Sequence, residues 1–215
     1  MLRRVTAYRW VPPFAAGLVR DHRVRWALEE AGLPYEERLI DVRDKPAEHL
    51  REQPFGQVPV YQEGDLVLFE SGAIVHHIAE SSPALMPSDP HGRAHTTMWL
   101  FAALNTIEPP IWQLVFLDEK NDARPKVVEQ TKRRLDQLAT ALGDRPYLVG
   151  DRFTAADLMM TSVLRILRST DLVEKVPALD AYKKRHEARP AFQKSLAAQL
   201  APFEKNAPPA TSPSP

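Results

Sequence analysis

A proline placed just inside a predicted strand is the feature that most constrains this chain. The segment Gln57-Val58-Pro59-Val60 starts a short apolar run, and proline cannot donate to a central ladder, so an edge position or a special bend is expected. We predict that the Val58-Pro59 bond is cis, because the Val58 amide and carbonyl then turn outward as a free donor and acceptor. An extended peptide can pair with such a backbone by strand addition. This segment therefore predicts a site for a small peptide.

Glu70-Ser71 supplies the other end of that site. The pair follows the apolar run 66–69 and precedes a helical pattern over 71–80, so Ser71 is predicted to be the N-cap of a helix. The unpaired amides of a helix N-terminus bind a carboxylate, and the Glu70 side chain can take an ammonium. A ligand with an amine, a carboxylate and an extended peptide backbone fits all three features.

The first 80 residues mix strand and helix patterns. Their order is strand, helix, strand, helix, strand, strand, helix, which is a thioredoxin-like βαβαββα layout. The predicted segments are 5–10, 24–31, 35–42, 46–51, 59–61, 66–69 and 71–80. We therefore expect a first domain over 1–81, and the prolines and serines of 82–92 predict an ordered linker after it.

Helical patterns fill the second domain, 93–205, and the remaining residues 206–215 are predicted to be a disordered tail without function. Pro109-Pro110 is expected to end or kink the first of these helices. The segment 155–167 is apolar nearly all round, as expected for a helix at the centre of a bundle. Thr154 and Asp157 have the spacing of a capping box at its start, which favours a structural role over a catalytic one.

Composition excludes several classes of function. Lys plus Arg and Asp plus Glu both total 28, so no global field favours nucleic acid or an anionic membrane. Cysteine is absent, which excludes disulfides, thiolate metal sites and a protein sulfur nucleophile. His91 and His95 are four apart but have no carboxylate ligand beside them, so no metal is expected. No long apolar run or signal-peptide pattern is present, and a cytoplasmic protein is expected.

Four motifs in order resemble the glutathione transferases. They are RVRWALEEAGLPY at 23–35, QPFGQVP at 53–59, ES at 70–71 and LVGDRFTAAD at 148–157. The resemblance extends from about Leu2 to about Phe203 and is to soluble, bacterial-like members, with the class unassigned. It implies an α/β N-terminal thioredoxin-like domain, an all-α C-terminal helical bundle, glutathione as co-substrate without a metal, and a two-fold homodimer.

The resemblance also implies which residues bind glutathione. The peptide would be held by Gln57, Val58, Pro59, Glu70 and Ser71. In this family a cation near the short second helix commonly meets the glycine carboxylate, which indicates Lys45 and His49. Solvated surface charge is the alternative for these two.

The loop after the first strand departs from the family. Most members place Ser, Tyr or Cys there to hydrogen-bond the glutathione sulfur, which favours the thiolate. Residues 9–21 contain no hydroxyl and no thiol. Alignment back from Arg23 puts the catalytic position near 18–20, so Arg20 or a nearby backbone amide is one candidate activator. Tyr8, the nearest phenol, is another, and a site elsewhere or no activation stays open.

We expect the acceptor pocket between the two domains, formed by the first loop and the helix after the linker. Its predicted residues are Trp10, Phe14, Trp99, Ala102, Ala103 and Thr106. For Trp99 and Trp112, a place in the core is the equal alternative.

The implied reaction is attack of the glutathione thiolate on a small hydrophobic electrophile: an alkyl or aryl halide, an activated alkene or, as a peroxidase, a hydroperoxide. Two alternatives remain. One is a non-catalytic glutathione-binding protein of the same fold, which the missing loop hydroxyl favours. The other is a glutathione-dependent disulfide reductase, which would need glutathione for both sulfurs because the chain has no cysteine.

Overall fold

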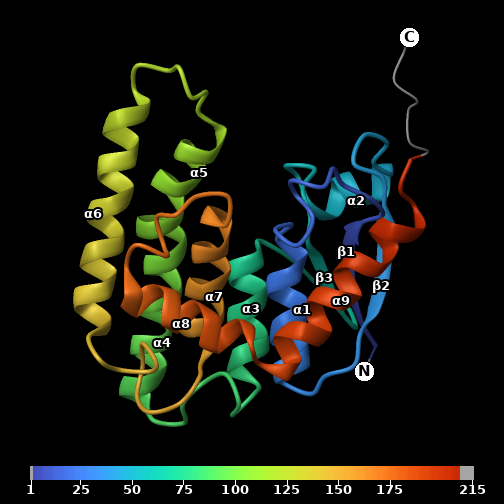
Figure 1. The fold of residues 1–215 in the computed structure, drawn as a ribbon. Coiled ribbons are helices and arrows are strands. Elements are labelled where there is room, and N and C mark those ends of the chain that lie inside the picture. The colour runs from blue at the N-terminus through green and yellow to red at the C-terminus, as the bar shows by residue number, and fades with distance from the viewer. Residues whose placement is uncertain (1, 209–215) are drawn as a thin grey trace.

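The computed structural model describes residues 2–208. Its N-terminal part has the predicted order of strands and helices, and a C-terminal part made of helices follows (Figure 1). The N-terminal elements are β1 (Arg3–Tyr8), α1 (Asp21–Glu30), β2 (Glu36–Ile40), α2 (Ala47–Glu52), β3 (Val60–Glu63), β4 (Leu66–Phe69) and α3 (Ser71–Glu80). The predicted thioredoxin-like layout is confirmed.

The sheet has the strand order β2-β1-β3-β4 and mixed directions. Strand β1 runs parallel to β2, with Ala7 beside Leu39, and antiparallel to β3, with Val5 opposite Tyr61. Helices α1 and α3 pack on each other and lie between the sheet and the C-terminal helices, where both contact α7 (Figure 1).

The C-terminal part is helical throughout, as predicted. Its elements are α4 (Pro90–Ala102), the π-helical turn η1 (Ala103–Ile107), α5 (Glu108–Phe116), α6 (Arg124–Leu142), α7 (Ala155–Leu164), the 3₁₀ turn η2 (Arg165–Leu167), α8 (Pro177–Glu187) and α9 (Pro190–Lys205). Of the predicted tail 206–215, residues 209–215 lie outside the described residues. No helix within 2–208 combines the length and apolar character needed to cross a membrane.

Two helix boundaries differ from the prediction for local reasons. Helix α4 starts at Pro90, inside the predicted linker, because Asp89 accepts a hydrogen bond from the Gly92 amide at 2.7 Å and proline suits the first helical position. The pair Pro109-Pro110 lies in the first turn of α5. A π-helical turn joins α4 to α5, so the helix path changes there without a loop.

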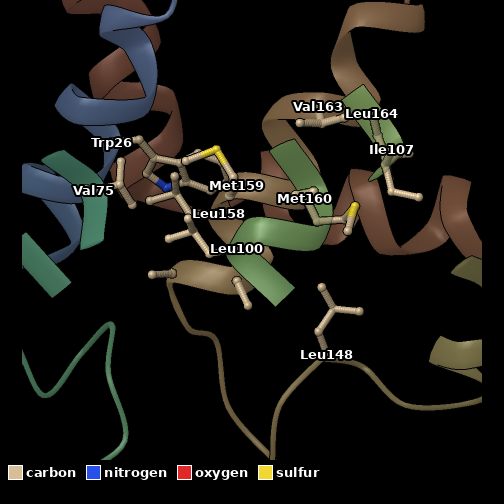
Figure 2. Close-up of a cluster of buried hydrophobic side chains, with 14 of the residues drawn as sticks. Trp26, Val75, Leu100, Ile107, Leu148, Leu158, Met159, Met160, Val163 and Leu164 are labelled. Carbon is tan, nitrogen blue, oxygen red and sulfur yellow. The ribbon is translucent and has the colours of Figure 1, made fainter. Parts of the chain in front are cut away.

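Helix α7 occupies the centre of the hydrophobic core. All of its residues are buried, and Figure 2 shows Leu158, Met159 and Met160 among side chains from other elements, including Trp26 of α1 and Leu100 of α4. The predicted capping box is present. Thr154 accepts a bond from the Ala156 amide at 3.3 Å, and Asp157 accepts one from the Thr154 amide at 3.0 Å.

The corner that enters α3 is tighter than predicted. The Val58-Pro59 bond is cis, as predicted, but the assignment of Ser71 as N-cap is wrong. Strand β4 ends at Phe69 and α3 begins at Ser71, so Glu70 alone makes the turn and is the N-cap. Its φ of 68° is in the region that favours glycine, a conformation that costs about 1–3 kcal/mol and clusters at functional sites.

Candidate active site

An apolar cleft of about 770 Å³ opens where loop 9–20, the cis-proline segment and α5 meet. The loop contributes Phe14, Ala15, Leu18, Val19 and Arg20, α5 contributes Trp112, Val115 and Phe116, and Tyr8, Gln57 and Val58 complete the lining. The rings of Trp112 and Phe116 stack with centroids 5.2 Å apart. This surface suits a flat or aliphatic apolar molecule.

A smaller polar pocket adjoins the cleft. It is lined by Arg20, Gln53, Gln57, Val58, Pro59, Glu70 and Ser71. Arg20, Gln57 and Val58 line both spaces, so the polar pocket and the apolar cleft are continuous at these residues. The five residues predicted to hold a peptide backbone therefore lie together around one pocket.

A buried carboxylate, Glu108, connects this region to α5. It accepts hydrogen bonds from Arg20 at 3.0 Å, from Arg23 at 2.8 Å and from the Trp112 indole at 2.7 Å. Burial alone would raise the pKa of Glu108, but Arg23 and Arg20 hold it below its usual value. The carboxylate is therefore ionised and holds two arginines from the start of α1.

The two arginines carry one more positive charge than Glu108 neutralises. Arg23 is buried and also donates to the Ser71 hydroxyl at 3.4 Å. The side chain of Arg20 is 38% exposed and lines both pockets, with its guanidinium carbon 5.9 Å from the Trp112 ring. Glu70, which lines the same pocket, also stabilises the charged form of Arg23. The guanidinium beside Ser71 can bind an anionic group of a ligand.

Tyr8, the other candidate activator, lies at the end of β1 and lines the same cleft. Burial raises the pKa of the Tyr8 phenol, and the nearby Asp21 carboxylate raises it further. The phenol is therefore neutral near pH 7 and can donate a hydrogen bond into the cleft. The structure brings Arg20 and Tyr8 to one space.

Two family models match this chain. The model described as Glutathione S-transferase, N-terminal domain, matches residues 8–80, and the one described as Glutathione S-transferase, C-terminal domain, matches 97–190. The chain belongs to the glutathione S-transferase family. Its helical second domain and thioredoxin-like first domain are those of a glutathione S-transferase, and its curated relatives are transferases of this kind.

Relatives and solved structures agree with this assignment. Glutathione S-transferase 4 of Zea mays is 34% identical over 225 residues, covering 95% of this chain and 96% of its own. The structure of glutathione S-transferase III in its apo form has a TM-score of 0.76 at 30% identity and covers all of both chains. A glutathione transferase from Burkholderia graminis, solved with two glutathione molecules per subunit, has a TM-score of 0.78 at 25% identity, over 92% of this chain and 88% of that one.

Of the residues predicted to form the acceptor pocket of this glutathione S-transferase, one lines the cleft and the others do not. Phe14 lines the cleft and is 74% exposed. Trp10, Trp99, Ala102, Ala103 and Thr106 are not among the lining residues. Helix α4 packs against α7, and its Trp99 lies half-buried against the core. The cleft is lined instead by Trp112, Val115 and Phe116 of α5, which follows the π-helical segment.

Lys45 and His49, the two residues predicted to bind the glycine carboxylate of glutathione, lie in different surroundings. Lys45 lies beside Gly56, where a Cβ built on that glycine would be 3.8 Å from Lys45 Nζ. His49 is only 1% exposed, and neither of its ring nitrogens has a hydrogen-bond partner among residues 2–208. Burial lowers the pKa of His49, which disfavours a charged ring at this position, and its contact with a glycine carboxylate stays a prediction.

Sequence reasoning missed Arg23 and Glu108. Arg23 belongs to the motif at 23–35, but that motif gives no sign that its side chain reaches Ser71. Glu108 precedes Pro109-Pro110 at a helix start, where a carboxylate is ordinary. No cluster of metal-binding residues was found anywhere in the described range 2–208.

Proposed function

We propose that this glutathione S-transferase conjugates glutathione to small apolar electrophiles. The observation that carries the proposal is the junction at Arg20, Gln57 and Val58, where a small polar pocket lined by the predicted peptide-binding residues adjoins an apolar cleft. Such a junction suits a reaction between a charged peptide and a hydrophobic acceptor.

The glutathione residues follow from the chemistry of the pocket. The Val58 backbone beside cis-Pro59 pairs with the peptide, Ser71 with the Arg23 guanidinium takes the γ-glutamyl carboxylate, and Glu70 takes the ammonium. Gln57, which lines the pocket, and Lys45, which lies beside Gly56, hold the glycine end. The glutathione thiol then faces the apolar cleft.

Thiol activation is assigned to Arg20, with help from amides at the start of α1. A thiol of pKa near 8.5 needs about 2.7 kcal/mol of differential stabilisation to be mostly ionised at neutral pH. A helix N-terminus supplies about 0.3–1 kcal/mol, while a nearby arginine in a partly buried site adds several before desolvation. Arg20 together with the helix amides can therefore stabilise the thiolate enough to ionise the thiol at neutral pH, whereas the amides alone cannot.

The thiolate sulfur attacks the electrophilic carbon of an acceptor held against Phe14, Trp112 and Phe116. A carbon–sulfur bond forms, and with a halide acceptor the halide ion leaves with the electron pair of the broken bond. With a hydroperoxide that fits the same cleft, the thiolate attacks the peroxide oxygen and releases an alcohol. A second glutathione then reduces the resulting sulfenic acid, which gives water and glutathione disulfide, so peroxidase activity is an extension of the same site.

We also propose a homodimer located in the cytoplasm. Support for a dimer comes from Met98 and Phe101 on α4, which are 51% and 54% exposed beside a groove that also includes His76 and Arg93. Apolar side chains grouped in this way favour contact with a second copy. Sedimentation of the wild type and of Phe101→Glu tests this, with dissociation expected only in the variant.

A crystal soaked in glutathione, combined with a turnover panel of an aryl halide, cumene hydroperoxide and a mixed disulfide, tests the function. We expect glutathione in the polar pocket and turnover of the aryl halide. Binding without turnover of any acceptor would instead identify a non-catalytic glutathione-binding protein. Turnover of the mixed disulfide alone would identify a reductase.

A further inference from the structure

Loop 9–20 has carbonyl groups that its own turns do not use. Within it, the Ala15 amide donates to Pro12 at 2.9 Å, Ala16 to Pro13 at 3.3 Å and Leu18 to Ala15 at 2.9 Å. These bonds form short turns and leave the carbonyls of Phe14 and Gly17 for donors outside the loop. A loop held only by such turns is mobile.

Side chains from the far end of the sequence bind those carbonyls. Arg165 of η2 donates to the Gly17 carbonyl at 2.8 Å, and Arg168 donates to the Phe14 carbonyl at 2.9 Å. Gln199 of α9 donates to the Val19 carbonyl at 3.0 Å and to the Asp21 carboxylate at 2.6 Å. The C-terminal domain therefore fixes the loop through residues that do not line the cleft.

Arg165 is itself fixed independently of the loop. It is 7% exposed, it pairs with Glu187 at 2.9 Å, and its guanidinium carbon is 4.7 Å from the Phe192 ring. The planar guanidinium binds Glu187 and the Gly17 carbonyl at the same time, which a lysine ammonium cannot reproduce in the same geometry. Gly17 suits the contact because its φ is 77° and a Cβ there would lie 3.3 Å from Arg168 Nη1 and from Leu196 Cδ1.

We propose that Arg165 is the positioning residue of the catalytic loop, with Arg168 and Gln199 in support. It holds the loop backbone so that Arg20 faces the thiol and Phe14 and Leu18 face the acceptor. Arg165 touches neither substrate, so it acts through the loop. This inference rests on the proposed function of the cleft.

The test compares Arg165→Lys with Arg189→Lys. Arg189 is a matched control, since it pairs with Glu30 at 2.6 Å and lies 4.0 Å over the Phe153 ring but donates to no carbonyl of loop 9–20. Each variant is measured for glutathione affinity, kcat and KM with an aryl halide, the pKa of bound glutathione, and hydrogen exchange of the Leu18 amide.

In Arg165→Lys we expect kcat/KM to fall about ten- to hundredfold, the thiol pKa to rise and the Leu18 amide to exchange at least about tenfold faster. Glutathione affinity should stay within about threefold, because Ser71, Glu70 and Val58 are not on the loop. Arg189→Lys should lose stability without these changes. Equal thiol pKa and loop exchange in the two variants would overturn the proposal.

Arg168→Met keeps the proposal testable if Arg165→Lys does not fold, because Arg168 is exposed and leaves no buried charge behind. It should speed hydrogen exchange of the Leu18 amide by a smaller factor than Arg165→Lys does. Unchanged exchange would count against the proposal that these side chains position the loop. Hydrogen exchange does not depend on turnover. If the wild type fails to conjugate glutathione but amide exchange in loop 9–20 still rises in these variants, the proposed function is refuted and the positioning of the loop by Arg165 is not.

Discussion

At the residue scale, Glu108 is the group that joins the two domains at the cleft. One buried carboxylate of α5 accepts bonds from Arg20 and Arg23 of the α1 region and from its own helix neighbour Trp112. Arg23 satisfies much of the charge of Glu108. Arg20 therefore keeps donors that are directed to no acceptor among residues 2–208, and these donors are available to an anion in the cleft.

Arg20→Ala is expected to raise the pKa of bound glutathione, since it removes the cation that favours the thiolate. Conjugation near neutral pH should then fall roughly tenfold for each unit of increase, with far less change in affinity. Titration of the thiolate absorbance of the complex measures the shift. Tyr8→Phe is the comparison, and a large shift in that variant with none in Arg20→Ala would mean that the phenol activates the sulfur.

Ser71→Ala is expected to weaken glutathione binding by about 1–3 kcal/mol. The hydroxyl is not a helix cap, but it is buried beside the ligand pocket and accepts a bond from Arg23, so its loss removes a partner of a charged ligand and of a buried guanidinium. Calorimetry checks this, with Ser81→Ala, whose hydroxyl bonds the Ile78 carbonyl, as the control. Unchanged affinity would put the glutathione carboxylate elsewhere.

At the element scale, α7 depends on the cap at its first turn. Asp157 accepts bonds from the Leu148 amide at 2.8 Å and from the Tyr182 hydroxyl at 2.8 Å in addition to its bond with Thr154. One carboxylate therefore joins the start of the central helix to the preceding loop and to α8.

Thr154→Ala should lower the free energy of unfolding by about 1 kcal/mol, the usual value of a cap. Asp157→Ala should lower it by more than about 3 kcal/mol, because two buried amides and a buried hydroxyl each lose a partner worth about 1–3 kcal/mol. Urea unfolding measures both. Asp180→Ala breaks a pair with the exposed Lys184 and leaves no buried donor in the described part of the chain without a partner, so it is expected to cost about 1 kcal/mol. Equal costs for the two aspartates would contradict this account.

At the scale of the whole molecule, His22 and His186 are buried among the helices in neutral form. Burial lowers the pKa of His186 to about 3, and Arg185 and Arg189 act in the same direction. Burial also holds the pKa of His22 well below its usual value, with Arg165 adding to the effect. In the unfolded chain both histidines titrate near pH 6.5.

Stability should therefore fall as the pH drops below about 6.5 toward 3, because the unfolded state binds protons that the folded state does not. Each histidine contributes up to about 1.4 kcal/mol per pH unit in this window. Urea unfolding at pH 7 and pH 5 measures the loss, which should be smaller in His186→Gln than in the wild type. His91→Gln, at an exposed position, should keep the full pH dependence. The same loss in both variants would show that His186 is not its source.

Local sequence determined the order of elements and several of their details. The alternation of strand and helix patterns and the capping box at Thr154 follow from interactions within a few residues, and the structure has both. The predicted cis bond at Val58-Pro59 is also present, although an X-Pro bond by itself prefers trans. Where the prediction missed by a residue, at Ser71, the cause was also local: the length of the turn between β4 and α3.

Tertiary structure alone decided which side chains meet at the cleft. Arg23 meets Glu108 across 85 positions and Arg165 meets Gly17 across 148, and no periodicity or motif spacing reports such contacts. The same holds for the choice of Trp112 over Trp99, since both are aromatic residues on amphipathic helices and only the packing of α4 on α7 decides which ring faces the cleft. Secondary structure depends mainly on interactions between residues close in sequence, whereas an active site depends on contacts between residues that are distant in sequence.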